Sequence, residues 1–305
     1  MLSKEGLRDY FDKELSKKLK ADNIKAGVCK GVMLLSLLIF MTSLIWAIVL
    51  LFGGKFNIKE TAFIPIAALL SISVLLLVFI YYTYVLRDLE KRIVAPVLHK
   101  IFEGNKIIYD KNRNLGKKEL AESGFVDGDN YRVDGEDYLE LDFESNDHPV
   151  NIKVSDVRVV VSQLSSDGNV RSRVADRGVF GIIDFNREVK TEILGNFNKR
   201  GFEALELESE DFNKVFTCYT KDQIEARKVL TPRTMARLLK LQDKIDDRPR
   251  FHLSGTKLYF LLDKDLFKYK IKGLVDFGEA EQIYDQVYII YQIASEMAKN
   301  EKIFK

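Results

Sequence analysis

Two long uncharged apolar runs constrain this chain more than any other feature of its sequence. Residues 32–52 and 63–86 contain no Asp, Glu, Lys, Arg or His, and only the ten residues 53–62 separate them. Each run exceeds the roughly 20 residues that a helix needs to cross about 30 Å of hydrocarbon. Because no water reaches that depth, the backbone groups must bond to one another within a helix. The sequence therefore predicts a transmembrane hairpin over residues 32–86.

The charges around the two runs predict their orientation. Residues 1–31 carry eight Lys or Arg against five acids, whereas the only basic residues of the connector 53–62 are Lys55 and Lys59. Basic residues are enriched in cytoplasmic segments, so we expect both termini in the cytoplasm and a short external loop at 53–62. The long, acid-containing leader and the lack of a small-x-small cleavage site favour a retained anchor over a cleaved signal peptide.

Residues 1–31 are expected to form a cytoplasmic amphipathic lead-in helix. Leu7, Phe11, Leu15 and Leu19 recur every four residues among charged neighbours, which indicates one apolar helix face. This face could lie on the inner membrane surface, where the basic residues attract anionic lipid, or pack against the soluble part of the chain. A solvated helix that only orients the first span is the plainer alternative.

Residues 87–118 are expected to form a juxtamembrane helix and a linker. The pattern of residues 86–102 continues the second span as a helix, and Pro96 is expected to kink it or end it near Ala95, because proline lacks a backbone N–H. The stretch 104–118 is polar and contains several Asn and Gly residues, which is typical of a loop.

Residues 119–305 are expected to form a cytoplasmic α+β domain with a mixed or antiparallel sheet and packed helices. Alternating or β-branched segments predict strands at 138–143, 150–154, 157–164, 179–186, 190–194, 215–219, 251–254 and 257–263. Asp222, followed by Glu225, and Thr231, followed by Pro232, are typical helix starts. A last amphipathic helix is expected over residues 279–302.

Two acidic stretches of the sequence are candidate metal sites. The residues Glu206, Glu208 and Glu210 alternate, so on a strand they would form one acidic face that could hold a divalent ion. No His or Asn partner is nearby in sequence, and a solvent-exposed face is the plainer interpretation. The acidic run 127–137 does not match a calcium loop, because Tyr and Arg stand where that loop needs an oxygen ligand and glycine. We predict no metal site.

A basic surface is the second candidate interaction site. It comprises Arg227, Lys228, Arg233, Arg237 and Lys240 on the two helices expected after residue 222. These residues could contact anionic lipid headgroups or a partner protein. Nucleic acid binding is not expected, because the chain from Arg87 to the C-terminus holds 37 basic against 39 acidic residues.

No local motif predicts a catalytic residue or a cofactor. The three histidines, His99, His148 and His252, show no ligand-like spacing, and the sequence contains no phosphate-binding glycine loop, GxSxG turn or Cys/His pair. A catalytic site assembled from distant residues stays open, but an enzymatic function is not favoured. Cys29 and Cys218 are too few for a disulfide framework and are expected to be reduced.

Several phrases of the sequence together carry a family resemblance. They are SGF at 123–125, GEDY at 135–138, GVFGIIDFN at 178–186, LESEDF at 207–212, DQIEAR at 222–227 and LTP at 230–232. They resemble an uncharacterised family of bacterial two-span inner-membrane proteins with a cytoplasmic C-terminal domain of unknown function. The resemblance implies a bacterial inner (plasma) membrane location, and it adds no catalytic residue.

The leading functional prediction is a membrane-anchored binding protein that acts as a scaffold or regulator. The lipid bilayer and either a membrane-protein partner or further copies of the chain are its expected partners. Two alternatives belong to other classes: a membrane-tethered enzyme that acts on a lipid or nucleotide through the acidic or basic residues, and an accessory subunit of a membrane transport complex.

Overall fold

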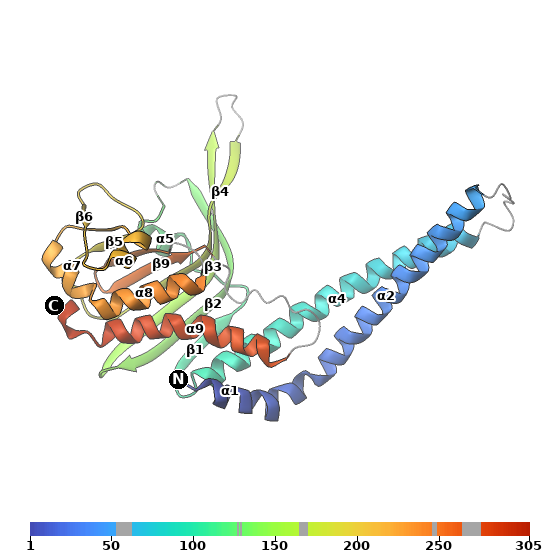
Figure 1. Cartoon of the computed structure of the whole chain (residues 1–305), viewed down its shortest axis with the longest axis horizontal. Helices are drawn as coiled ribbons and strands as arrows, with labels where there is room; N and C mark the ends of the chain where they lie inside the picture. Colours follow the sequence, from blue (N-terminus) through green and yellow to red (C-terminus); the bar gives the residue numbers. More distant parts are fainter. Residues whose placement is uncertain (53–62, 127, 129, 165–169, 246–248, 264–275) are drawn as a thin grey trace. The chain divides into compact units, whose positions relative to one another are not determined.

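The computed structural model describes residues 1–52, 63–126, 128, 130–164, 170–245, 249–263 and 276–305. Two compact units make up the chain. One consists of Leu2–Lys100 with Tyr269–Gln282, and the other of Ile101–Lys268 with Ile283–Lys305. The first is helical and the second is built on a sheet, and Figure 1 labels their elements.

The helical unit contains the hairpin. A continuous helical path comprises α1 (Lys4–Tyr10), the π-helical η1 (Phe11–Leu15) and α2 (Ser16–Phe52), and α4 (Phe63–Ile101) returns beside it (Figure 1). Both α2 and α4 include stretches long and apolar enough to cross a membrane. The two-helix hairpin predicted from the sequence is thus confirmed, and the connector 53–62 lies outside the described residues.

The four-residue apolar stripe of the lead-in helix is buried. Leu7, Phe11, Leu15 and Leu19 are each at most 5% exposed, and the Phe11 ring packs edge-on against Phe277 at 5.9 Å. An α-helix repeats every 3.6 residues, so a four-residue pattern drifts by about 40° per step. The wider π-helical turns of η1 reduce this drift. The helix therefore packs its stripe against protein, which was one of the arrangements left open by the sequence.

Pro96 does not end α4 near Ala95, which was one of the two outcomes predicted for it. The helix continues through it to Ile101. Ile93, Val94, Val97 and Leu98 around the proline are completely buried. Each buried side chain of this size contributes about 1.5–3 kcal/mol, and together they offset the roughly 3 kcal/mol that an interior proline costs.

The sheet unit holds one antiparallel sheet of nine strands, in the order β1-β2-β3-β4-β9-β8-β5-β7-β6. Its strands are β1 (Lys106–Asp110), β2 (Tyr131–Ser145), β3 (His148–Leu164), β4 (Val170–Asp184), β5 (Ile193–Gly195), β6 (Glu203–Leu205), β7 (Cys218–Thr220), β8 (Arg250–Ser254) and β9 (Lys257–Leu262). With its helices, this sheet confirms the α+β fold class.

Several strands differ from the sequence-based expectation: β6 was not predicted, and β2 and β4 begin well before the predicted residues 138 and 179. β1 lies within the stretch 104–118 that was expected to be a linker, and it pairs with β2 from Lys106↔Asp142 to Asp110↔Tyr138. β3 is one strand where two were expected. At the predicted break, the buried Ser155 hydroxyl accepts a hydrogen bond from the Leu115 backbone N–H at 2.9 Å.

Helices cover both faces of the sheet. They are α5 (Lys117–Ser123), α6 (Glu210–Val215), α7 (Gln223–Val229), α8 (Pro232–Ile245) and α9 (Phe277–Ala298), followed by the short 3-10 helix η2 (Glu301–Ile303). The expected helix starts are confirmed: Asp222 accepts from the backbone N–H groups of Ile224 and Glu225, and Thr231 accepts from that of Thr234.

The two sides of the sheet have separate apolar cores. On one side, Leu120 of α5 packs with Val159, Phe180 and Leu261. On the other, α8 and the sheet-unit part of α9 lie over β8 and β9 (Figure 1) and enclose an almost wholly apolar cavity of about 40 Å³. On this second side, aromatic rings lie directly over two glycines: Phe260 over Gly181 and Phe251 over Gly195.

Candidate functional site

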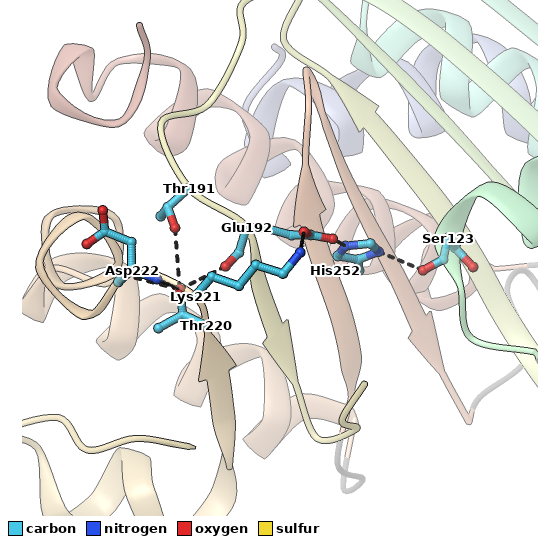
Figure 2. A network of polar contacts seen from close by, with 7 residues as sticks. All are labelled: Ser123, Thr191, Glu192, Thr220, Lys221, Asp222 and His252. Atoms are coloured by element: carbon cyan, nitrogen blue, oxygen red, sulfur yellow. Dashed lines mark hydrogen bonds and ion pairs between the residues drawn. The ribbon is translucent and has the colours of Figure 1, made fainter. Parts of the chain in front are cut away.

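A buried histidine joins three segments that are far apart in sequence. His252 of β8 is 4% exposed. Its Nδ1 lies 2.7 Å from the carbonyl oxygen of Ser123, at the end of α5, and its Nε2 lies 2.7 Å from Oε1 of Glu192, just before β5. Figure 2 shows these groups in one line across the sheet. The imidazole therefore connects α5 to β8 and to the segment entering β5.

The conformation at the end of α5 directs the Ser123 carbonyl oxygen toward His252. Gly124 adopts φ 67°, the left-handed conformation that commonly terminates helices and that glycine adopts without strain. The Ser123 hydroxyl donates to the Leu120 carbonyl at 2.7 Å and accepts from the Phe125 N–H at 3.2 Å. The Ser123 hydroxyl thus pairs with backbone groups at the helix end, and the Ser123 carbonyl oxygen faces His252.

The polar contacts continue from Glu192 to the start of α7. Lys221 Nζ lies 3.2 Å from Oε2 of Glu192. The Thr220 hydroxyl donates to the Glu192 carbonyl oxygen at 2.9 Å and accepts from the Asp222 N–H at 3.1 Å. Since Asp222 caps α7, one network connects α5 with α7 (Figure 2).

Protonation of the His252–Glu192 pair is set by opposing influences. Burial lowers the pKa of His252 and outweighs the hydrogen bonds to Ser123 and Glu192, which raise it. Partial burial disfavours the charge on Glu192, yet the hydrogen bonds from His252 and Lys221 outweigh burial and lower the pKa of its carboxyl. A neutral imidazole has one N–H, so it can donate to only one of its two oxygen partners at a time.

This network fits a structural role better than a catalytic one. Both nitrogens of His252 are occupied by protein oxygens, so neither is free to exchange a proton with a substrate. The ring is also flanked by Phe197 at 6.1 Å and Tyr259 at 6.0 Å. The network holds together the segments that carry it, and a polar cleft lies beside them.

The polar cleft, of about 690 Å³, lies on the side of the sheet that α5 covers and is bordered by Phe197 and Leu261. It is lined by residues 174–177 of β4, residues 196 and 197 after β5, and Thr217, Tyr219, Arg250, Leu261 and Asp263. Arg250 precedes His252 by two residues on β8, so both side chains project from the same side of that strand. The network and the cleft therefore share β8 as their support.

The charges in the cleft are paired within the protein. Arg250 of β8 forms an ion pair with Asp176 of β4, and the Arg250 guanidinium lies 5.6 Å from the Phe125 ring centroid. At the rim, Arg177 lies 3.9 Å from Asp263. The cleft therefore presents pre-oriented charges without a large net charge, an arrangement suited to recognising a polar partner.

Asn196 fixes one wall of the cleft. It adopts φ 60°, a conformation that asparagine tolerates better than most residues. Its side chain donates to the Pro249 carbonyl at 2.9 Å and accepts from the Thr217 N–H at 3.0 Å. Three loops are thereby held together at the mouth of the cleft.

The acidic residues expected on one strand do not share a strand. β6 ends at Leu205, Glu206 and Glu208 lie in the following loop, and Glu210 begins α6. The physical reason is a local helix start: the Ser209 hydroxyl accepts from the Phe212 N–H at 3.3 Å. Phe212 is then completely buried. These residues therefore do not meet the condition, a shared strand, on which the possible acidic face depended.

The basic residues lie apart from the lining of the cleft and mostly have partners. Arg227 donates to the Glu206 carbonyl oxygen at 3.3 Å, and Lys228 pairs with Glu225 at 2.6 Å. Arg233 and Arg237 both pair with Glu296 of α9, at 3.7 and 3.0 Å. The fifth residue, Lys240, is exposed on α8. Whether they contact headgroups stays a prediction.

Sequence reasoning missed the network and the cleft. His252 was set aside as an isolated histidine, and Arg250 fell one residue before the expected strand. The available sequence indication was alternation over residues 250–254, which places Arg250 and His252 on the same side of a strand. The partners Ser123 and Glu192 could not be inferred, because 129 and 60 residues separate them from His252.

Comparison with known proteins gives one family match. Residues 177–299 match a family model described as a protein of unknown function (DUF3137). The matched region contains Glu192, Lys221, His252 and most of the cleft, and it excludes Ser123 and the helical hairpin. The match supports the resemblance to an uncharacterised family with a domain of unknown function. Searches of curated proteins and of solved structures found no match.

Proposed function

We propose that this chain is a bacterial inner-membrane protein that holds a binding domain, its sheet unit, on the cytoplasmic side as a scaffold or regulator of a membrane-protein partner. The observation that carries the proposal is the apolar surface of the hairpin. Outside α2 and α4, the exposed large apolar residues among those described are only Met1, Ile108, Val174 and Ile224.

The hairpin surface supports anchoring. Within α2 and α4 almost every turn of the apolar runs exposes Leu, Ile or Phe, and patches of this size are rare on soluble proteins. The interhelical ion pair of Asp22 with Arg92, at 2.9 Å, lies outside both runs, where water or headgroups can solvate it. Together with the basic residues of segment 1–31, this favours cytoplasmic ends.

The sheet unit supports binding over catalysis. Its cleft is open and polar, and its charged groups are already paired in fixed positions. The titratable His252 beside it is engaged on both nitrogens. Preformed polar surfaces of this kind recognise a partner at little reorganisation cost.

Topology mapping tests the anchor. In a chain with Cys29 and Cys218 replaced by alanine, single cysteines would be placed at Lys4, Lys59 and Lys305. In intact cells a membrane-impermeant maleimide should label only position 59, and positions 4 and 305 should react only after the membrane is opened. Labelling of position 4 or 305 from outside would refute the proposed orientation.

Co-purification tests the binding role. The tagged chain, extracted from its own membranes in mild detergent, should carry a partner in fixed proportion or form a defined oligomer. Asn196→Ala, which frees the Pro249 carbonyl and the Thr217 N–H, should weaken that association, whereas the control Lys299→Ala, at an exposed position just after α9, should not. A monomer that carries no partner in fixed proportion would refute the proposal.

A further inference from the structure

The first half of β4 has a neighbouring strand on only one side. β3 pairs with β4 along its whole length, from Leu164↔Val170 to Asn151↔Asp184. On the other side, β9 pairs only with residues Val179–Asp184. Among the described residues, no strand pairs with that side of residues 170–178. Figure 1 shows the β3–β4 pair extending past the neighbouring strands.

In the part of the chain that the structure describes, two hollows border this edge. The polar cleft of about 690 Å³ and a second hollow of about 700 Å³ are both lined by Val174 and Arg177 of β4. An added strand would run about 4.8 Å from β4, and both hollows offer room for its side chains. Val174 is 41% exposed, so the edge also presents an apolar contact.

The edge is basic. Arg171, Arg173 and Arg177 are exposed on β4, and Arg158 of β3 lies directly opposite Arg177. The single acid of this half of β4, Asp176, is paired with Arg250. Like charges that face each other across strands are destabilising. Asp263, 3.9 Å from Arg177, already offsets part of the repulsion between Arg158 and Arg177, and an incoming carboxylate would offset more of it.

The second hollow limits where such a carboxylate can bind. Its lining includes the acids Asp134, Glu136 and Asp156 beside the two arginines. Asp134 is paired with Arg132 at 3.2 Å. Anionic groups would therefore be favoured along the exposed arginine side chains and disfavoured deep in the second hollow.

We propose that residues 170–177 of β4 bind an extended acidic segment of a partner protein as an additional strand. Backbone hydrogen bonds to the edge would supply affinity. The register shift opposite Val159 and Val160 places Arg173 and Arg177 on opposite faces of the sheet, so carboxylates on both faces of the added strand would supply specificity. A second copy of the chain is disfavoured, because its own arginines would face these. The inference rests on the proposed binding function and names the chemistry of its partner.

A synthetic peptide tests the proposal with the full chain in phosphatidylcholine nanodiscs. The probe is the eight-residue glutamate–valine peptide Val-Glu-Val-Glu-Glu-Val-Glu-Val, whose two adjacent central glutamates place carboxylates on both faces of the added strand. It should bind and slow amide exchange in residues 170–177. A matched peptide with proline in place of valine cannot form the strand hydrogen bonds and should not bind. Equal binding of both peptides would overturn the proposal.

Charge reversal identifies the site. Arg173→Glu combined with Arg177→Glu should weaken binding of the glutamate–valine peptide at least tenfold, while Lys299→Glu, an exposed reversal just after α9, should leave it unchanged. The thermal unfolding midpoint of each variant checks folding. Unchanged peptide binding by a folded double variant would overturn the proposal, as would amides of residues 170–177 that are already protected without peptide.

Two further outcomes distinguish peptide binding at β4 from two alternatives: a role of the arginines in preventing self-association, and partner binding elsewhere on the chain. If the arginines only prevent edge-to-edge association, Arg173→Gln with Arg177→Gln would cause self-association, and the wild-type chain would not bind the peptide. If the double charge-reversed chain still co-purifies with a partner from membranes, the general binding function stands and the β4 site is refuted.

Discussion

At the scale of single residues, His252 should make stability depend on pH. Burial holds its pKa in the folded chain below the usual value near 6.5. As the pH falls from about 6.5, the unfolded chain then binds a proton that the folded chain does not. The free energy of unfolding should therefore fall, by at most about 1.4 kcal/mol per pH unit from this group.

Replacement of the histidine isolates that contribution. His252→Gln keeps a polar side chain in the network but removes the titration, so denaturant unfolding between pH 7 and 5 should show a shallower loss of stability than in the wild type. Glu192 adds a loss only at lower pH, because the pKa of its carboxyl is also lowered. If acidification stabilised the wild type relative to the variant, the contact with Glu192 would dominate over burial.

Gly181 should tolerate no side chain while Phe260 covers it. A Cβ at this position would lie 2.1 Å from the Phe260 ring, and the backbone on both sides is fixed in β4 pairing with β3 and β9. Overpacking of this kind costs about 1–3 kcal/mol. Gly181→Ala should lower the free energy of unfolding by that amount in denaturant titrations.

The ring itself provides the control for Gly181. Phe260→Leu costs stability alone, but it removes the ring that the new methyl group would strike. The double variant should therefore be more stable than the sum of the two single effects predicts. Strict additivity would show that the ring moves aside freely and that the close approach is unimportant.

The sequence predicted individual contacts where the two residues are close together in the chain. The caps at Asp222 and Thr231 lie within three residues of the N–H groups they bind, so sequence order alone indicated them. The contacts of His252 depend on strand order in the sheet. Since sequence does not give that order, the histidine looked isolated.

At the scale of elements, the ion pair between α2 and α4 should stabilise the hairpin. The Asp22 side chain is only 10% exposed and lies 2.9 Å from Arg92 of α4 and 3.5 Å from Lys25. Asp22→Ala should lower the stability of the hairpin by about 1–3 kcal/mol, measured as a lower thermal unfolding midpoint in detergent.

An exposed pair on the same helical path serves as the control. Asp9 and Lys13 lie 2.8 Å apart, and both side chains are 72% exposed. Surface pairs contribute about 0–1 kcal/mol, so Asp9→Ala should shift the midpoint little. Equal shifts for Asp9→Ala and Asp22→Ala would contradict a stabilising role for the interhelical pair.

Helices and strands were predictable where a local sequence pattern, and not tertiary pairing or burial, determines them. The two apolar runs and the strand pair at residues 250–262 carry strong local patterns. β1 and α6 were missed, because five residues of β1 become a strand only by pairing with β2, and α6 depends on burial of Phe212. Pro96 does not end α4, because the burial of its neighbours outweighs the local cost of a proline inside a helix.

At the scale of the whole molecule, the hairpin should decide where the protein resides, and arginine substitutions can distinguish a membrane span from an exposed helix in water. Leu77 lies near the middle of residues 63–86 and is 65% exposed, whereas Tyr84 lies near the end of that run and is 69% exposed. Around a water-soluble helix, arginine would be tolerated equally at both positions, because both side chains face outward.

In a bilayer the two positions differ sharply. Arginine at the centre of a span costs about 2.5–3.5 kcal/mol, whereas near an end its long side chain can reach the headgroups. Leu77→Arg should therefore reduce the fraction of the chain that resists alkaline extraction from membranes, while Tyr84→Arg and the size control Leu77→Ala should not. Equal extraction of the two arginine variants would mean that α4 does not lie across the hydrocarbon, and the anchoring role of the hairpin would fail with it.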